Sequence, residues 1–249
     1  MDVEDRNGVT IARLHHGPVN ALDVDYLRQI TETLRSLAAS SLRAVILTGA
    51  GTTVSAGADL KRVVSEERAY VESGVHALSE CFGTLFNFPR PVVAAVNGPA
   101  IAGGCVLACA CDYRVASSGA GLIGLAELAV GVPFPSYALE IVRFATPAQH
   151  FQKLVYLAES FPPDEARRQG LVDEVVEPDR LLDRATELAE RLAAIPAGTF
   201  EVVKRLVRRP TVDRVERYSR EHDAEAARLW GSKEVRESIS DFMDRLRTH

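Results

Sequence analysis

The chain has 249 residues, of which 47% are hydrophobic and 25% are charged, and its formal net charge is −5. This balance is typical of a globular protein, and a negative net charge gives no basis for binding nucleic acid, whose phosphates attract a basic face. Charged or proline residues interrupt every apolar run before it reaches the length of a membrane span, and residues 1–6 lack the apolar segment of a signal peptide. We therefore expect a cytoplasmic protein that binds neither nucleic acid nor membrane.

The first half of the chain alternates between short apolar segments and amphipathic ones, which predicts an α/β fold. We expect strands at residues 8–15, 43–48, 92–96 and 112–116, and a brief extended piece at 121–123. Helices are expected from an N-cap at Asp23 to about Ala39, over 66–88 and over 103–110. Pro18 to Leu22 is expected to form a turn or a short strand.

The second half is mostly helical, with one further strand. Helices are expected at 136–143, 147–158 and 163–169, and the last strand at 171–176. From Arg180 onward the pattern is helical to Arg247, with breaks near Pro196, Pro210 and Gly231. We divide the chain into an α/β core at 1–180 and a helical region at 181–249, whose amphipathic helices suit contacts between subunits.

Neither a metal nor a nucleotide cofactor is expected. Three of the four cysteines, Cys105, Cys109 and Cys111, are closely spaced, but no histidine lies near them and their neighbours are Val, Leu and Ala. This pattern indicates small, buried, free thiols in a reduced compartment. The segment Thr48 to Val54 begins like a dinucleotide-binding loop after a strand, but the third glycine of that motif is missing.

Two turns rich in small residues carry the strongest functional signal. One is Ser55-Ala56-Gly57-Ala58-Asp59-Leu60, and the other runs from Asn97 to Val106 through Gly98, Gly103 and Gly104. Each turn follows an apolar strand and leads toward a helix. Two such turns placed side by side would direct two free N–H groups at one point, which is the geometry that stabilises a carbonyl oxygen as it gains negative charge.

These two turns resemble those of the crotonase superfamily, which includes the enoyl-CoA hydratases and isomerases. Three further segments match in the same order, so the resemblance extends almost from end to end. They are Pro18-Val19-Asn20-Ala21-Leu22, Cys111-Asp112-Tyr113-Arg114-Val115-Ala116 and Glu165 to Asp173. The resemblance implies a spiral of ββα units with C-terminal helices, assembled as a homotrimer or homohexamer.

The resemblance also assigns the groups that bind substrate. It places the two oxyanion N–H groups on Ala56 and Gly103. It implies that coenzyme A is held mainly by backbone groups of two segments. The first segment consists of Asn20, Ala21 and Leu22, and the second of Ala56, Gly57, Ala58, Asp59 and Leu60. Gly103 and Gly104 are expected to lie beside the thioester. Asp59 itself is expected to cap the turn that follows it.

The acid–base residues determine which reaction is catalysed. Hydratases of this superfamily have two glutamates, and the position of the first is occupied here by Val106, which cannot activate water. Glu127 occupies the second position, in an apolar run where desolvation should raise its pKa toward that of a useful base. Glu140 is a reserve acid–base candidate, although a surface ion pair with Arg143 is favoured for it. Val106 and Phe134 are expected to line the pocket.

A single base suffices to move a proton along an allylic system, whereas hydration usually requires two groups to handle one water. The sequence therefore favours a Δ3-Δ2-enoyl-CoA isomerase, with an acyl-CoA thioester as substrate and no further cofactor. The segment around Phe134 also resembles enoyl-CoA isomerases of the mitochondrial type. Two alternatives stay open: an enoyl-CoA hydratase or acyl-CoA hydrolase, and a non-catalytic protein that binds acyl-CoA.

Overall fold

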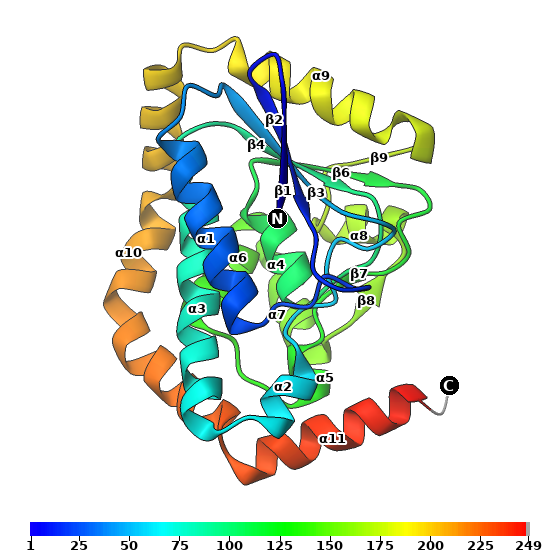
Figure 1. Cartoon of the computed structure of the whole chain (residues 1–249), viewed down its shortest axis with the longest axis vertical. Coiled ribbons are helices and arrows are strands. Elements are labelled where there is room, and N and C mark those ends of the chain that lie inside the picture. Colours follow the sequence, from blue (N-terminus) through cyan, green and yellow to red (C-terminus); the bar gives the residue numbers. More distant parts are fainter. Residues whose placement is uncertain (248–249) are drawn as a thin grey trace.

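The computed structural model describes residues 1–247, and a six-stranded sheet lies at its centre (Figure 1). The strand order is β1-β2-β3-β4-β6-β9, in which β1 and β2 pair antiparallel and the other neighbours pair parallel. These strands are β1 (Asp2–Arg6), β2 (Val9–Leu14), β3 (Ala44–Gly49), β4 (Val92–Val96), β6 (Tyr113–Ser117) and β9 (Glu174–Val176). A smaller sheet combines β5 (Ala100–Ile101), β7 (Ile123–Gly124) and β8 (Ser160–Phe161).

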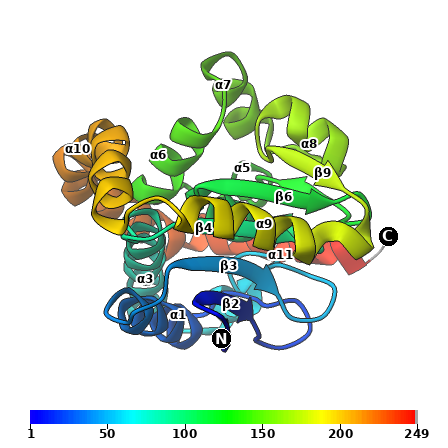
Figure 2. The same cartoon turned by 90° about the horizontal axis from the view of Figure 1, so that it is seen from above.

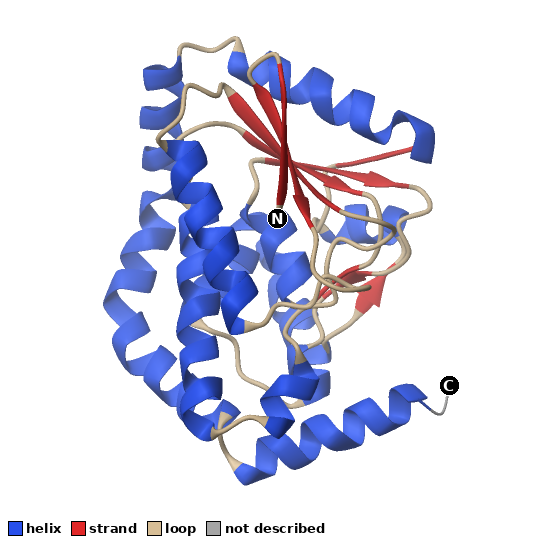
Figure 3. Ribbon diagram, in the orientation of Figure 1, coloured by secondary structure: helices blue, strands red, loops and turns tan. Residues whose placement is uncertain are grey.

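Helices make up most of the rest of the described chain, and Figure 3 shows how they surround the strands. They are α1 (Val24–Ala38), α2 (Leu60–Ser65), α3 (Arg68–Phe86), α4 (Gly103–Ala110), α5 (Glu127–Val130), α6 (Ser136–Ala145), α7 (Ala148–Leu157), α8 (Pro163–Gln169), α9 (Leu181–Ala193), α10 (Ala197–Trp230) and α11 (Lys233–Arg247), with a 3-10 turn at Pro178–Arg180. Within residues 1–247, no helix combines the length and the apolar character needed to cross a bilayer.

The two faces of the large sheet are both buried, because alternate residues of each strand point to opposite sides. Ala44 and Ile46 pack with residues of α9, which lies along one face of the sheet (Figure 2). Val45 and Leu47 belong to the core on the other face, which α1, α3 and α4 cover. The predicted α/β class is confirmed. The division at residue 180 stays a prediction, and α9 packs into the core.

A buried ionic cluster attaches α10 to the core. Lys204 Nζ and Arg208 Nη2 each lie 2.7 Å from the carboxylate of Asp112, which follows the end of α4. Arg208 also donates to the carbonyl oxygens of Phe86 and Ala110. Because these groups are buried and mutually satisfied, they fix the position of α10 against α3 and α4.

The predicted break near Pro210 is wrong, since α10 continues through it. Proline removes one helical hydrogen bond and usually bends a helix, and Figure 1 shows that α10 curves along its length. Anchored side chains on the adjoining turns, Arg208 and the buried Thr211, hold the helix against the core at this point. The expected breaks near Pro196 and Gly231 are confirmed, as is the capping of α1 by Asp23.

Five elements were not predicted, namely β1, α2, β5, α5 and β8, and two of them show why. All five residues of β1 are exposed, so this strand lacks the alternation of apolar and polar residues that would reveal it. The short helix α5 lies in an apolar run without a helical period.

The four cysteines are free and buried, as expected, and burial raises the pKa of Cys81 and Cys111 to about 12.

Candidate active site

The two small-residue turns lie side by side. Ser55 and Ala100 form a parallel bridge, and the N–H of Ile101 donates to the carbonyl of Ser55 at 3.0 Å. Gly57 has a φ of +85°, and a Cβ on it would lie only 3.2 Å from the amide nitrogen of Gly103. The close approach of the two turns therefore requires glycine at position 57.

The prediction that Ala56 offers a free N–H is wrong, because this group donates to the carbonyl of Val19 at 3.0 Å. The bridge between Leu22 and Ala58 explains the pattern. Leu22 donates to Gly57 and accepts from Asp59, so the N–H of Ala58 points away from the bridge. It finds no acceptor within residues 1–247 and is therefore the available donor of this turn.

The N–H of Gly103 also lacks an acceptor in the described part of the chain, because this residue begins α4. The aligned peptides of α4 add a partial positive charge at this end. A Cβ on Gly103 would lie 3.0 Å from Leu22 Cδ1, and one on Gly104 would lie 2.3 Å from the carbonyl oxygen of Ser55. Together, the N–H groups of Ala58 and Gly103 can stabilise negative charge on a carbonyl oxygen.

Ala102, which directly precedes Gly103, has a strained backbone. Its φ of 50° and ψ of −122° lie in a region that favours glycine. The N–H of Ala102 donates to Gly124 at 2.9 Å, and its carbonyl accepts from Val106 at 3.0 Å. These two bonds hold the peptide that orients the N–H of Gly103, so the strain lies next to a functional group.

We expect Ala102→Gly to raise the free energy of unfolding by about 1 kcal/mol, because the Cβ strain exceeds the entropy that glycine adds to the unfolded chain. Urea denaturation measures this change. Ala224→Gly is the matched control, since Ala224 is exposed within α10 and its replacement should lower stability by about 1 kcal/mol. A loss of stability in both variants would contradict the strain at Ala102.

A strand pairing brings the segment of Glu127 next to the segment of Gly103. Strand β5, which leads into Gly103, pairs parallel with β7, which leads into Glu127 three residues later. The side chain is 6% exposed, and its Oε2 accepts a hydrogen bond from the N–H of Ala126 at 3.0 Å. Burial raises the pKa of the Glu127 carboxyl to about 7, and the hydrogen bonds from nearby backbone groups offset this only in part. A carboxyl with such a pKa can accept and return a proton near neutral pH.

The remaining predicted pocket and acid–base residues lie elsewhere or in the core. Glu140 accepts from Arg143 at 3.0 Å and from Arg214 at 2.6 Å, so both carboxylate oxygens are occupied by the expected ion pair and a second one. Val106 is fully buried within α4, and Phe134 packs partly buried against the same core. These contacts give Glu140 a role in joining α6 to α10.

The segments expected to hold coenzyme A lie next to each other, but most of their backbone groups are paired. The carbonyl of Asn20 accepts from Ser55 Oγ at 2.7 Å, and its side chain bonds to His16 N and Thr53 O. Gly57 N donates to Ser55 Oγ. Asp59 caps α2 as expected, by accepting from Lys61 N and Arg62 N. Much of the predicted binding surface is therefore structural, and the backbone of Ala58 remains available.

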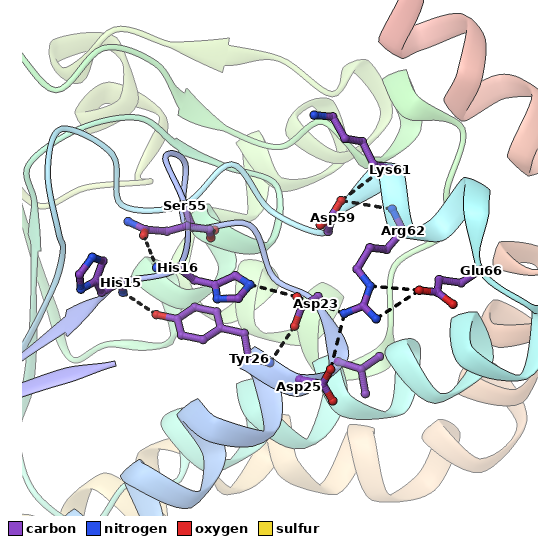
Figure 4. Close-up of polar contacts among 12 residues, drawn as sticks. His15, His16, Asp23, Asp25, Tyr26, Ser55, Asp59, Lys61, Arg62 and Glu66 are labelled. Atoms are coloured by element: carbon purple, nitrogen blue, oxygen red, sulfur yellow. Dashed lines mark hydrogen bonds and ion pairs between the residues drawn. The ribbon is translucent and has the colours of Figure 1, made fainter.

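Figure 4 shows a polar network that the sequence did not predict as a unit. Asp23 accepts from Tyr26 N and lies 3.0 Å from His16 Nε2 and 3.3 Å from Arg62 Nη1. Arg62 is also paired with Glu66 and stacks over the ring of Tyr70. The network joins the loop before α1 to α2 and so holds Ala58 in place. The N-cap position of Asp23 was the only part of this network that the sequence indicated.

Comparisons with known proteins agree with this geometry. The profile of a family described as enoyl-CoA hydratase/isomerase matches residues 4–249. Enoyl-CoA delta isomerase 1, mitochondrial, from Mus musculus is 30% identical over 251 residues, covering 99% of this chain and 86% of the relative. A short-chain-enoyl-CoA hydratase from Clostridium acetobutylicum is 32% identical over 195 residues, covering 77% and 74%.

Among solved structures, human mitochondrial delta3-delta2-enoyl-CoA isomerase superposes with a TM-score of 0.91 at 28% identity. The match covers 99% of this chain and 97% of the human one. A probable enoyl-CoA hydratase from Mycobacterium tuberculosis reaches 0.84 at 27% identity, covering 90% and 94%. The chain therefore belongs to the enoyl-CoA hydratase/isomerase family of enzymes.

Proposed function

We propose that this enzyme is a Δ3-Δ2-enoyl-CoA isomerase that uses Glu127 as its single base. The observation that carries the proposal is one buried carboxyl with a pKa of about 7 beside two N–H groups that have no acceptor in the described chain. Val106 occupies the position of the first of the two hydratase glutamates, and its hydrocarbon side chain is fully buried. This arrangement supports a proton shift over the addition of water.

In the proposed reaction, the carboxylate of Glu127 removes a proton from C2 of a 3-enoyl thioester. The electron pair of that C–H bond delocalises over the dienolate, whose oxygen accepts hydrogen bonds from the N–H groups of Ala58 and Gly103. Glu127 then returns the proton at C4, so the double bond moves from C3–C4 to C2–C3. Each step is a proton transfer, and we propose that the coenzyme A of the substrate is the only cofactor present.

Isomerisation of 3-octenoyl-CoA in deuterated water tests the proposal. We expect 2-octenoyl-CoA as the product, deuterium exchange at C2, and hydration slower than isomerisation by a large factor. Faster formation of 3-hydroxyoctanoyl-CoA would favour the hydratase alternative, and release of free coenzyme A would favour the hydrolase. Tight binding without exchange at C2 would favour a non-catalytic acyl-CoA-binding protein.

We also propose that the chain assembles into a homotrimer or a hexamer of two trimers. Exposed apolar side chains on α10 support this, because Val203, Leu206 and Val207 are 53%, 65% and 57% exposed. Phe144 on α6 lines the same surface cavity as Val203 and Val207, so the apolar area extends beyond one helix. Light scattering distinguishes the monomer from the two assemblies.

The cytoplasmic location stays a prediction, since some relatives named above are mitochondrial.

A further inference from the structure

The C-terminal helix α11 lies against two short helices, α2 and α5, which adjoin the proposed functional groups (Figure 1). Helix α2 follows the first small-residue turn, and α5 begins with Glu127. One hydrophobic cluster contains Val235 and Ile239 of α11, Val63 of α2 and Val130 of α5. Helix α11 is therefore packed against both parts of the proposed site.

Ser238 joins α11 to α5. Its Oγ donates to the carbonyl of Val130, in the last turn of α5, at 2.8 Å. Gly131 permits this approach, because a Cβ on it would lie 3.0 Å from Ser238 Cβ and would overlap the hydroxyl oxygen. Helix α5 has only four residues, and so short a helix has little stability of its own. The position of Glu127 therefore depends on the elements that hold α5.

Arg236 joins α11 to α2. Its Nη1 donates to the carbonyl of Val64, in the last turn of α2, at 3.3 Å. The Nε of Arg236 is buried and has no acceptor within residues 1–247. An unpaired buried N–H lowers the stability of a protein, so stability alone does not account for an arginine at this position.

The two side chains flank the apolar face of α11. Successive residues of an α-helix are turned by about 100°, which places Arg236 on one side of the buried Val235 and Ile239 and Ser238 on the other. The last carbonyls of a helix have no partner within it, so each side chain supplies a donor that α2 or α5 lacks. A single helix thereby fixes the ends of both short helices.

We propose that Arg236 and Ser238 are positioning residues, which act through α2 and α5 to hold Ala58 and Glu127 in a fixed relative placement. This inference rests on the proposed function, in which the N–H of Ala58 and the carboxylate of Glu127 act on the same thioester. A misplacement of about 1 Å between reacting groups costs on the order of 100-fold in rate, so loss of either link should be visible in kcat.

Amide hydrogen exchange tests the link to α5 without substrate. The N–H groups of Gly131 and Val132 both donate to the carbonyl of Glu127 at 2.9 Å. Ser238→Ala should make these amides exchange about fivefold faster, the effect of losing one hydrogen bond that holds this turn. Ser240→Ala is the matched control, because its hydroxyl bonds to Arg236 O within α11, and it should leave the exchange unchanged.

Steady-state kinetics with 3-octenoyl-CoA test the consequence for catalysis. Ser238→Ala and Arg236→Met should each lower kcat about tenfold and leave KM nearly unchanged. Arg236→Lys should recover most of the rate, since its ammonium can still donate to the carbonyl of Val64. Arg247→Met makes the matched change at an exposed arginine whose partner Asp244 lies on α11 itself, and it should retain full activity.

The double variant Arg236→Met/Ser238→Ala shows whether the two links share one role. Breaking either link already frees the two short helices from each other, so the double variant should lose about tenfold, not the roughly 100-fold of two independent effects. A 100-fold loss would overturn the shared role, and unchanged kcat in both single variants would overturn the proposal. If Ser238→Ala does not fold, the Met and Lys variants of Arg236 decide it. A wild type that does not isomerise 3-octenoyl-CoA would reject the proposed function, while faster exchange in Ser238→Ala would still support the link from α11 to α5.

Discussion

Glu127→Gln is expected to lower kcat for 3-octenoyl-CoA isomerisation by about 100- to 10,000-fold, because an amide cannot accept the C2 proton. In the wild type, kcat/KM should rise with pH up to about 7 and then level off, since the carboxylate form of Glu127 is the base. Initial rates across a pH series measure both effects. An active Glu127→Gln variant with the same pH profile would assign the base to another residue.

The stability of this variant provides the control against unfolding. Burial raises the pKa of Glu127 from 4.5 to about 7, so the folded state favours the neutral form. The group therefore stabilises the fold most below its unfolded-state pKa, and this contribution is lost as the pH rises through about 7. The shift corresponds to a free energy on the order of 3 kcal/mol. Glutamine resembles the neutral acid, so at about pH 8 the variant should be more stable than the wild type by up to that amount.

The burial and raised pKa of Glu127 could be predicted because the evidence for them was local. Glu127 is a single carboxylate within Gly124-Leu125-Ala126-Glu127-Leu128, and apolar neighbours make burial and a raised pKa foreseeable. Its distance from Gly103 in the chain is bridged by the pairing of β5 with β7, two strands of two residues each. Such short strands carry no periodicity of their own, so the resemblance to a family was needed to place Glu127 beside the turns.

The first oxyanion donor shows what a motif leaves undetermined. Ser55 to Asp59 contains several small residues, and the motif alone does not tell which N–H is free. That depends on the segment before α1. The N–H of Ala56 donates to the carbonyl of Val19, whereas the bridge to Leu22 uses the carbonyl of Gly57 and the N–H of Asp59, so the N–H of Ala58 has no acceptor among residues 1–247.

Gly103→Pro is expected to lower kcat by about 100- to 1,000-fold, the typical effect of losing one oxyanion-hole donor. Proline removes the N–H of Gly103 at a position where the helix itself does not use it, since Gly103 is the first residue of α4. KM should change much less than kcat, because the enolate oxygen depends on this donor more than the ground-state carbonyl does. Steady-state kinetics with 3-octenoyl-CoA separate the two parameters.

Gly103→Ala is the matched control, since it adds a Cβ while keeping the N–H. That Cβ would lie 3.0 Å from Leu22 Cδ1 and 3.4 Å from Phe82 Cζ, two side chains that can shift by a few tenths of an ångström. Its activity should therefore fall by about tenfold at most, the cost of a small misfit in a pocket. If alanine and proline reduced kcat equally, added bulk would account for both losses, and the N–H of Gly103 would have no part in holding the enolate. A large excess loss in the proline variant, with binding of octanoyl-CoA retained, is the result that an oxyanion donor at Gly103 requires.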